Sequence, residues 1–282
     1  MTPGPVLRLA LCNEVLRHLP FEAQCAAAAA LGCSGLELAP FTLAADPSTL
    51  DEAEAARLRR IAAEHGLVIS SLHWLLVQPE GLSLSTPDAA LHARTVTFLA
   101  QLIRFASACG AGVLVHGSPK QRSPWPGQSA ADALARCEQG WAQLATVAQA
   151  QGVVYCIEPL SRAETPVLNT VAQAAAVVDR IGSPALRTMF DLSAAAQTET
   201  GPLEQVLRQH LASGHIAHVQ LNDRNRRGPG QGDTPVAPVL RVLRDAGYAG
   251  WIALEPFDYH PEPMACAAAS AGYVRGIWEA LT

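Results

Sequence analysis

Short apolar runs recur along the chain, and a longer segment with helical periodicity separates each run from the next. In the second half of the chain, four such runs each end near one polar residue. These runs are residues 153–160, 186–191, 216–220 and 251–257. Short apolar runs of this kind predict buried strands, and the helical segments between them predict a βα repeat. The pattern therefore predicts four successive strands of one parallel sheet.

One polar residue stands at the end of each of these strands: Glu158, Asp191, Gln220 and Glu255. Consecutive members of this set are 33, 29 and 35 residues apart. A strand, a loop and a helix fill about that length in one βα unit, so the spacing matches successive units. In a closed barrel, the C-terminal ends of the strands meet at one mouth. We therefore expect the four side chains to lie together there.

The rest of the chain repeats the same alternation without a break in composition. The other predicted strands are residues 6–12, 35–40, 67–76 and 113–116. The predicted helices are residues 21–31, 50–65, 86–109, 130–151, 170–181, 202–212, 238–246 and 264–281. Eight strands, each followed by a helix, predict an α/β fold, a (β/α)8 barrel. The length of 282 residues is close to the roughly 250 residues of a typical barrel, so one domain is expected over residues 1–282.

Composition narrows the class of protein. Hydrophobic residues make up 49% of the chain and charged residues 16%, enough for a large core. The net charge of −5 argues against nucleic acid as a partner, because nucleic-acid binders carry basic patches. Seven cysteines without a CxxC pair suggest reduced thiols and a cytoplasmic location. Residues 1–5 lack the features of a secretion signal, and no apolar run of about 18 residues predicts a membrane span.

Three carboxylates cannot share a small volume fully ionised unless a cation is present, because like charges raise each other's pKa. A single divalent metal ion at the mouth is the simplest solution. The oxygen donors of Glu158, Asp191, Gln220 and Glu255 suit Mn²⁺ or Mg²⁺ best, with Co²⁺ or Zn²⁺ left open. The alternative is that these are ordinary acids at strand ends.

Three further polar residues lie at the ends of predicted strands. Glu37 could contact a substrate or hydrogen-bond a neighbouring loop. His73 and His116 are predicted substrate contacts, since a single histidine at a strand end more often contacts substrate than metal. For His116, a satisfied position in the core is the alternative.

Two long loops are expected near the mouth. Residues 117–129 are rich in Pro, Gly and Ser, which is typical of a binding loop or lid. Its Lys120 and Arg122 could hold an anionic group or simply be solvated. Residues 222–233 present arginines that could bind a carboxylate, a phosphate or a pair of hydroxyls.

Several of these segments resemble one known family, the sugar phosphate isomerases and epimerases with a xylose isomerase-like TIM barrel. The chain is similar to D-tagatose 3-epimerase and hydroxypyruvate isomerase of that family. The resemblance is carried by residues 157–164, 190–191, 218–220, 225–230 and 254–257. It implies a TIM barrel and a small sugar or sugar acid as substrate. A homodimer or homotetramer remains open.

The resemblance also implies roles for individual residues. Glu158 and Glu255 would be metal ligands and the two proton-transfer residues, with Asp191 and Gln220 as the other ligands. The residues that would contact the hydroxyls of the sugar are Glu164, His218 and Arg226. The chain departs from the ketose epimerases at two positions. Gln220 replaces a histidine, as in hydroxypyruvate isomerases, and Ala194 stands where epimerases commonly carry another histidine.

The predicted chemistry follows from the site. A cation beside a substrate carbonyl stabilises the charge of an enediolate, so a glutamate can remove the neighbouring carbon-bound proton. Return of the proton to the other face of the same carbon is epimerisation. Return of the proton to the adjacent carbon interconverts aldose and ketose. A lyase or dehydratase acting on a keto-sugar or keto-inositol would use the same site. An apurinic endonuclease with three metals and a non-catalytic sugar-binding module are less favoured alternatives.

Overall fold

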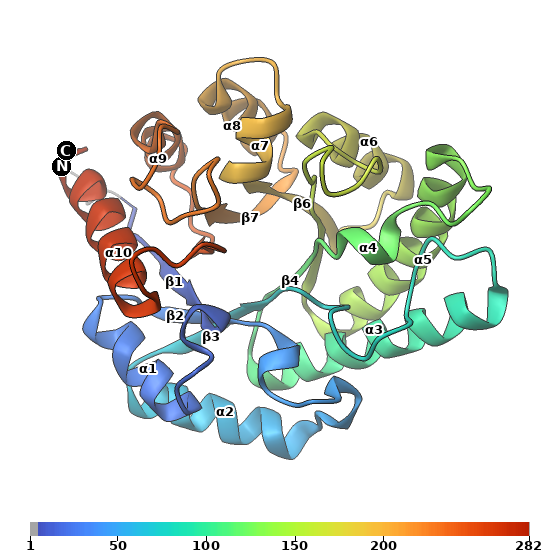
Figure 1. The fold of residues 1–282 in the computed structure, drawn as a ribbon, viewed down its shortest axis with the longest axis horizontal. Coiled ribbons are helices and arrows are strands. Elements are labelled where there is room, and N and C mark those ends of the chain that lie inside the picture. Colours follow the sequence, from blue (N-terminus) through green and yellow to red (C-terminus); the bar gives the residue numbers. More distant parts are fainter. Residues whose placement is uncertain (1–4, 282) are drawn as a thin grey trace.

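Each strand of the protein pairs in parallel with the next strand along the chain, and the last pairs with the first, so the sheet closes into a barrel (Figure 1). The computed structural model describes residues 5–281. Its strands are β1 (Leu9–Cys12), β2 (Gly35–Leu38), β3 (Val68–Leu72), β4 (Val113–His116), β5 (Val154–Ile157), β6 (Leu186–Asp191), β7 (Ile216–Leu221) and β8 (Ile252–Leu254). The predicted TIM barrel is thereby confirmed.

Helices surround the barrel on its outside (Figure 1). They are α1 (Phe21–Ala30), α2 (Glu52–Glu64), α3 (Ala89–Cys109), α4 (Pro119–Arg122), α5 (Ala130–Gln151), α6 (Val171–Ile181), α7 (Leu192–Thr198), α8 (Leu203–Ala212), α9 (Val236–Asp245) and α10 (Pro263–Ala280). Short 3-10 turns also occur, namely η1 (Asn13–Leu16), η2 (Pro40–Thr42) and η3 (Pro47–Thr49). The long helices match the predicted ranges to within a few residues at each end.

Local sequence explains where these helices begin and end. The hydroxyl of Ser129 accepts from the backbone N–H of Asp132, and the Asp132 side chain accepts from the backbone of Ser129, which forms a capping box at the start of α5. Gly152 ends the same helix in the left-handed conformation. Helix α2 begins two residues later than predicted, because the side chain of Asp51 caps it by accepting from the backbone N–H of Glu54.

Alternating residues of the strands divide the core into two layers. One layer fills the barrel with Val113, Val115, Cys156 and Met189. The residues between them along the strands, such as Leu114 and Phe190, belong to the larger apolar layer that includes residues of the surrounding helices. Period-two alternation of this kind is what a barrel requires. It also decides which polar side chains at the strand ends point into the mouth.

Three remaining expectations concern the whole chain. Residues 1–4 and 282, which include most of the segment inspected for a secretion signal, lie outside the described residues. Within residues 5–281, no helix is long and apolar enough to cross a membrane. All seven cysteines are buried and free.

Candidate metal centre and active site

The predicted ligands come from four consecutive strands and lie at the same end of the barrel. Glu158 follows β5, Asp191 ends β6, Gln220 lies in β7 and Glu255 follows β8, and all four are buried. Asp191 and Gln220 are direct neighbours across the β6–β7 ladder. Glu158 and Glu255 line one small cavity of about 20 Å³. A volume of this size holds about one ion or water molecule.

Hydrogen bonds hold Asp191 on both carboxylate oxygens. Its Oδ1 accepts from the backbone N–H of Ala194 at 2.6 Å, which caps helix α7. Its Oδ2 accepts from Nδ2 of Asn222 at 2.7 Å. Asn222 also reaches the carbonyl of Glu255 at 3.3 Å and accepts from the N–H of Ser193 at 2.7 Å. This asparagine therefore joins β6 to β8.

Sequence reasoning missed Asn222 as a residue of the site. The signal for it was present, since Asn222 lies two residues after Gln220 and period-two alternation places both on the same side of the strand. The composition of residues 222–233 instead places it in a polar loop.

Glu158 is packed against the strand next to its own. A Cβ atom added at Gly117, directly after β4, would overlap Oε2 of Glu158, so only glycine leaves room for this carboxylate. The backbone carbonyl of Glu158 accepts from Nη1 of Arg122 at 2.6 Å. Arg122 is fully buried, and its Nη2 lies 3.4 Å from the carbonyl of Leu168. It therefore neither binds an anion at the surface nor is solvated, contrary to both readings of the sequence.

Glu255 is held by His73, which extends from the end of β3. Nδ1 of His73 lies 2.8 Å from Oε1 of Glu255, and Nε2 lies 2.8 Å from Oε2 of Glu14 in η1. Burial alone would lower the pKa of His73, but the carboxylates of Glu14 and Glu37 raise it well above its usual value. His73 thus contacts a predicted catalytic glutamate directly.

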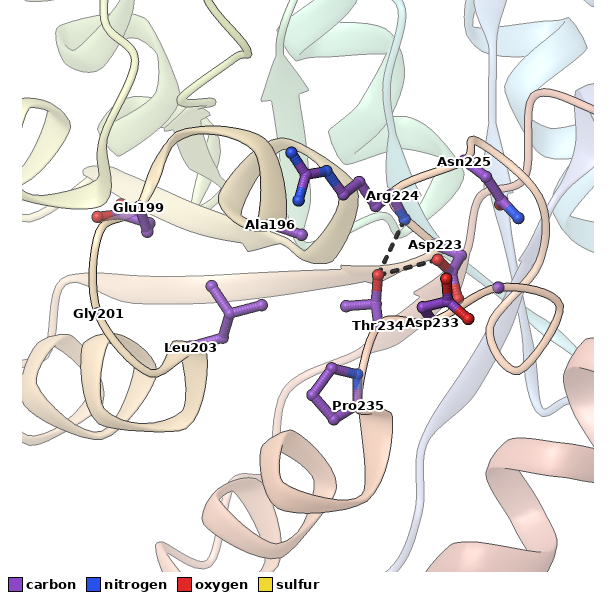
Figure 2. A pocket seen from close by; sticks show the side chains of 11 residues that line it. Ala196, Glu199, Gly201, Leu203, Asp223, Arg224, Asn225, Asp233, Thr234 and Pro235 are labelled. Atoms are coloured by element: carbon purple, nitrogen blue, oxygen red, sulfur yellow. Dashed lines mark hydrogen bonds between the residues drawn. The ribbon is translucent and has the colours of Figure 1, made fainter.

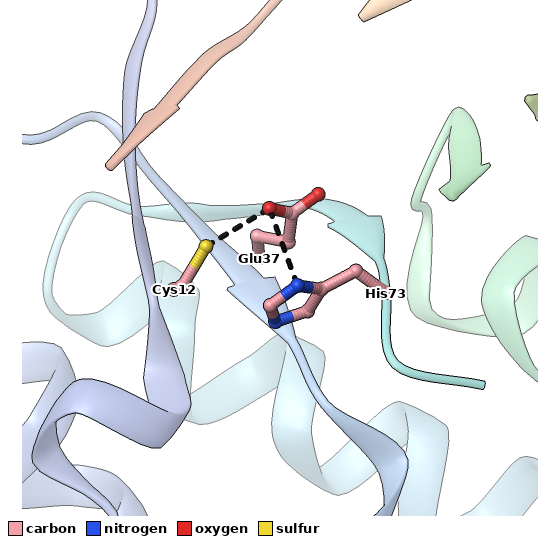
Figure 3. A group of neighbouring side chains, drawn as sticks. All are labelled: Cys12, Glu37 and His73. Carbon is pink, nitrogen blue, oxygen red and sulfur yellow. Dashed lines mark hydrogen bonds and ion pairs between the residues drawn. The ribbon is translucent and has the colours of Figure 1, made fainter. Parts of the chain in front are cut away.

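Gln220 is held by Glu37 at the end of β2. Nε2 of Gln220 donates to Oε2 of Glu37 at 2.9 Å. Nε2 of His218 lies 2.9 Å from Oε1 of Glu37, and Sγ of Cys12 donates to Oε2 at 2.9 Å. Figure 3 shows Cys12 and His73 converging on Glu37. Burial would raise the pKa of Glu37, but the His218 and His73 imidazoles hold it well below its usual range.

The residues present fit a cation on two grounds. First, Oε1 of Gln220 and Oε2 of Glu255 are buried without a hydrogen-bond partner among the described residues. A buried polar oxygen without a partner is costly, and a cation would satisfy both atoms. Second, burial and the nearby Glu255 and Asp191 carboxylates raise the pKa of Glu158. Burial raises the pKa of Asp191 to about 7 and that of Glu255 to about 8.

Two overlapping groups of side chains bring possible ligand atoms within 4.8 Å of one another. They are Cys12, Glu37 and His73, and Glu14, His73 and Glu255. The second group shares Glu255 with the predicted set. Within it, His73 already pairs both of its ring nitrogens with carboxylates, so its contacts are those of a residue supporting a ligand. The set Glu158, Asp191, Gln220 and Glu255 stays a prediction.

The predicted substrate contacts do not all lie at the mouth. Glu164 and His73 line the cavity together with Glu158 and Glu255. Arg226 lies at its rim, where an Nη1–Oε1 distance of 3.9 Å separates it from Glu164.

His218 is fully buried on Glu37, one layer below Gln220, and does not line this cavity. His116 points away from the barrel interior, toward Trp141 of α5, and its Nδ1 lies 2.6 Å from Oη of Tyr155. The expectation of substrate contact does not fit His116, which is the core histidine of the alternative reading.

Aromatic residues cover the cavity. Trp74 and Phe257 line it and contact each other edge to face, with ring centroids 6.0 Å apart. The guanidinium carbon of Arg226 lies 4.6 Å from the centre of the Phe257 ring. Trp74, Arg226, Leu168 and Ser118 have positive φ angles of 51°, 70°, 59° and 45°. They are the non-glycine residues with positive φ in the described part of the chain, and such strain is typical of functional sites.

The predicted mouth loop carries Trp125 between α4 and α5. Its indole N–H donates to the hydroxyl of Ser83 at 3.1 Å, so the loop is attached to the segment that precedes α3.

A larger pocket of about 420 Å³ lies outside the barrel mouth, between the α7–α8 connection and the loop before α9 (Figure 2). Its lining includes Glu199, Asp223, Asp233 and Thr234 but none of the predicted ligands. Volume alone therefore does not identify the site. The candidate site is instead the small cavity, because buried carboxylates line it.

A family model described as the xylose isomerase-like TIM barrel matches residues 25–276 of the sequence. The chain belongs to this family. The D-psicose 3-epimerase of Enterocloster bolteae is 30% identical over 233 residues, which cover 81% of this chain and 74% of that protein. The L-ribulose 3-epimerase of Mesorhizobium japonicum is 28% identical over 229 residues, which cover 80% and 72%.

A crystal structure of D-psicose 3-epimerase in the presence of D-fructose superposes with a TM-score of 0.83. It is 22% identical and covers 98% of this chain and 99% of that one, so it supports the fold. Membership of this group of sugar epimerases and isomerases makes the chain an enzyme of that group with a buried candidate metal site.

Proposed function

We propose that the protein is a divalent-metal-dependent ketose 3-epimerase that moves a proton between two glutamates. The observation that supports this most strongly is that Glu158 and Glu255, from β5 and β8, line the same buried cavity. Two carboxylates that reach one substrate carbon from different sides can remove a proton from one face and return it to the other. The ketose 3-epimerases among the relatives support the same assignment.

The ligand set is proposed to be Glu158, Asp191, Gln220 and Glu255, with Mn²⁺ or Mg²⁺ favoured by their oxygen donors. The bound cation would stabilise the negative charge that develops on the substrate oxygens. Asn222 and the N–H of Ala194 would keep Asp191 in place, and His73 would fix one oxygen of Glu255. Glu164 and Arg226 would bind hydroxyls of the sugar at the rim.

The protein's own side chains supply the proton transfers. Burial of Glu158 and Glu255 raises the pKa of each carboxyl, which brings them closer to the range useful for general acid and base catalysis. Trp74 and Phe257 would exclude water once the substrate is bound. The cavity of about 20 Å³ is smaller than a sugar, so residues that line it would have to move for a sugar to enter.

One residue favours a second reaction of the same type. Gln220 stands where the ketose epimerases of the resemblance usually carry histidine and hydroxypyruvate isomerases carry glutamine. If the chain acts like the hydroxypyruvate isomerases, the second glutamate would return the proton to the adjacent carbon and interconvert an aldose and a ketose. The two reactions share the enediolate and differ in the carbon that receives the proton.

Solvent exchange tests the proposal directly. The purified protein is incubated in D₂O with Mn²⁺ and a candidate substrate, and the products are analysed by NMR. The candidates are ketoses and aldoses of three to six carbons, and hydroxypyruvate. Deuterium at C3 with inversion would indicate epimerisation, deuterium at the neighbouring carbon isomerisation, and loss of water a dehydratase. Glu158→Gln and Glu255→Gln should each abolish exchange while circular dichroism shows a folded barrel. Full exchange in either variant would contradict the two-glutamate mechanism.

A further inference from the structure

The side-chain amide of Gln220 has two different ends, and the structure gives them different surroundings. Nε2 donates to Oε2 of Glu37 at 2.9 Å, whereas Oε1 is buried without a partner among the described residues. An amide nitrogen only donates and an amide oxygen only accepts. The oxygen and the NH₂ group of the amide are similar in size. The amide of a glutamine can therefore rotate by 180° and exchange the two with little steric consequence.

The surroundings of Glu37 make it a fixed acceptor. It is fully buried at the end of β2 and comes within 2.9 Å of both Nε2 of His218 and Sγ of Cys12. Nδ1 of His73 is 3.9 Å away. A carboxylate in this position can accept from the amide of Gln220 but cannot donate to it. The flipped amide would place two oxygen atoms against each other in a buried site.

We propose that Glu37 is a positioning residue that turns the amide of Gln220 so that its oxygen, and not its nitrogen, faces the candidate ligands Asp191 and Glu255. This inference rests on the proposed metal site and adds a residue from β2 to it. A glutamine needs a neighbour that selects one of its two orientations, and Glu37 supplies that selection.

The first test is Glu37→Gln, which keeps the shape of the side chain. The introduced amide keeps an oxygen toward His218 and places its NH₂ group toward Gln220, so Gln220 turns its own NH₂ group toward the cation site. Isothermal titration with Mn²⁺ should show an affinity at least about 10-fold lower than in the wild type, the lower end of the effect expected for a supporting residue. Thermal unfolding monitors the fold of each variant.

The second test exchanges the two functional groups. The double variant Glu37→Gln, Gln220→Glu restores one donor and one acceptor with the direction of the hydrogen bond reversed, and an oxygen again faces the cation. Its Mn²⁺ affinity should return to within about threefold of the wild type or exceed it. Gln220→Glu alone places two carboxylates side by side and should lower thermal stability. Glu64→Gln is the matched control, because it makes the same change on an exposed carboxylate of α2, and its affinity should stay within about twofold of the wild type.

The outcomes separate the two proposals. A wild-type protein that binds no divalent cation overturns the proposed function itself. A wild type that binds Mn²⁺, together with a folded Glu37→Gln variant of equal affinity, overturns only the role of Glu37. If Glu37→Gln does not fold, the double variant decides: binding supports the orientation by Glu37, and a folded double variant that does not bind overturns it.

Discussion

Nδ1 of His73 lies 2.8 Å from Oε1 of Glu255, while the opposite nitrogen of the same ring lies 2.8 Å from Oε2 of Glu14. The imidazole thus connects the end of β8 to the turn that follows β1. Because Oε2 of Glu255 has no partner among the described residues, this contact leaves one oxygen of the carboxylate fixed and the other available. Supporting histidines and carboxylates of this kind orient the ligands of metal sites.

Replacement of His73 should therefore weaken the site more than the fold. We expect His73→Leu to lower Mn²⁺ affinity by about 10- to 100-fold, measured by isothermal titration, because Glu255 loses the group that orients it. His65→Leu at the end of α2 is the matched control and should bind like the wild type. Equal Mn²⁺ affinity in His73→Leu and the control would contradict this role for His73.

Arg122 should contribute to stability through two backbone carbonyls. Its guanidinium donates to the carbonyls of Glu158 and Leu168 in a fully buried position. Arg122→Met leaves the carbonyl of Glu158 without a donor, whereas the carbonyl of Leu168 keeps the backbone N–H of Leu160. The free energy of unfolding should therefore fall by about 1–3 kcal/mol in urea titrations. Lys120 lies on the same short helix but is exposed, so Lys120→Met should change the free energy of unfolding by less than about 0.5 kcal/mol. A similar small change in both variants would show that the buried guanidinium does not stabilise the fold.

Gly117 should be intolerant of any side chain because of Glu158. A methyl group there would overlap Oε2 of the carboxylate and push it from the cavity. We expect Gly117→Ala to reduce solvent exchange at least about 100-fold, since a displaced catalytic group loses roughly that factor. Gly112→Ala has open space around its added methyl group and should keep wild-type exchange. Normal exchange in Gly117→Ala would remove Glu158 from the proposed mechanism.

His116 should make the fold sensitive to acid. Burial, followed by the charge of Arg122, lowers the pKa of this imidazole to about 3, compared with about 6.5 in an unfolded chain. Between these values the unfolded chain binds a proton that the folded chain does not, so stability is complete above pH 6.5 and declines as the pH falls toward 3. His116→Gln keeps an acceptor for Tyr155 and cannot titrate.

The measurement compares urea unfolding at pH 7 and pH 5. The loss of unfolding free energy between these pH values should be smaller in His116→Gln than in the wild type by about 2 kcal/mol. An identical loss in both proteins would mean that His116 is protonated in the folded state or exposed to solvent.

The sequence predicted the barrel and the position of four polar residues at its strand ends, because both depend on periodicity along the chain. The role of these residues as ligands stays a prediction. Strands of three to six residues alternate with amphipathic helices, and this fixes the order of the strands without any knowledge of contacts. Glu158, Asp191, Gln220 and Glu255 then follow from their positions at strand ends.

The direction of individual side chains was harder to predict. His73 and His116 both stand at strand ends, but a shift of one residue reverses the side of the sheet that a residue faces. His116 consequently lies against Trp141, while His73 reaches Glu255. Arg122 was missed because arginines in loops are usually exposed, and only the tertiary structure shows the two carbonyls it satisfies. Helix α7 was not predicted because a seven-residue segment carries little periodicity.

Asp191 has two tasks that share one carboxylate. Its Oδ1 caps α7 through the N–H of Ala194, and the same group is a proposed ligand. A cation held by Asp191 would draw electron density from the carboxylate that caps this helix. The ¹⁵N–¹H resonance of Ala194 at the start of α7 would then report cation binding at the barrel mouth in solution, without any sugar or turnover.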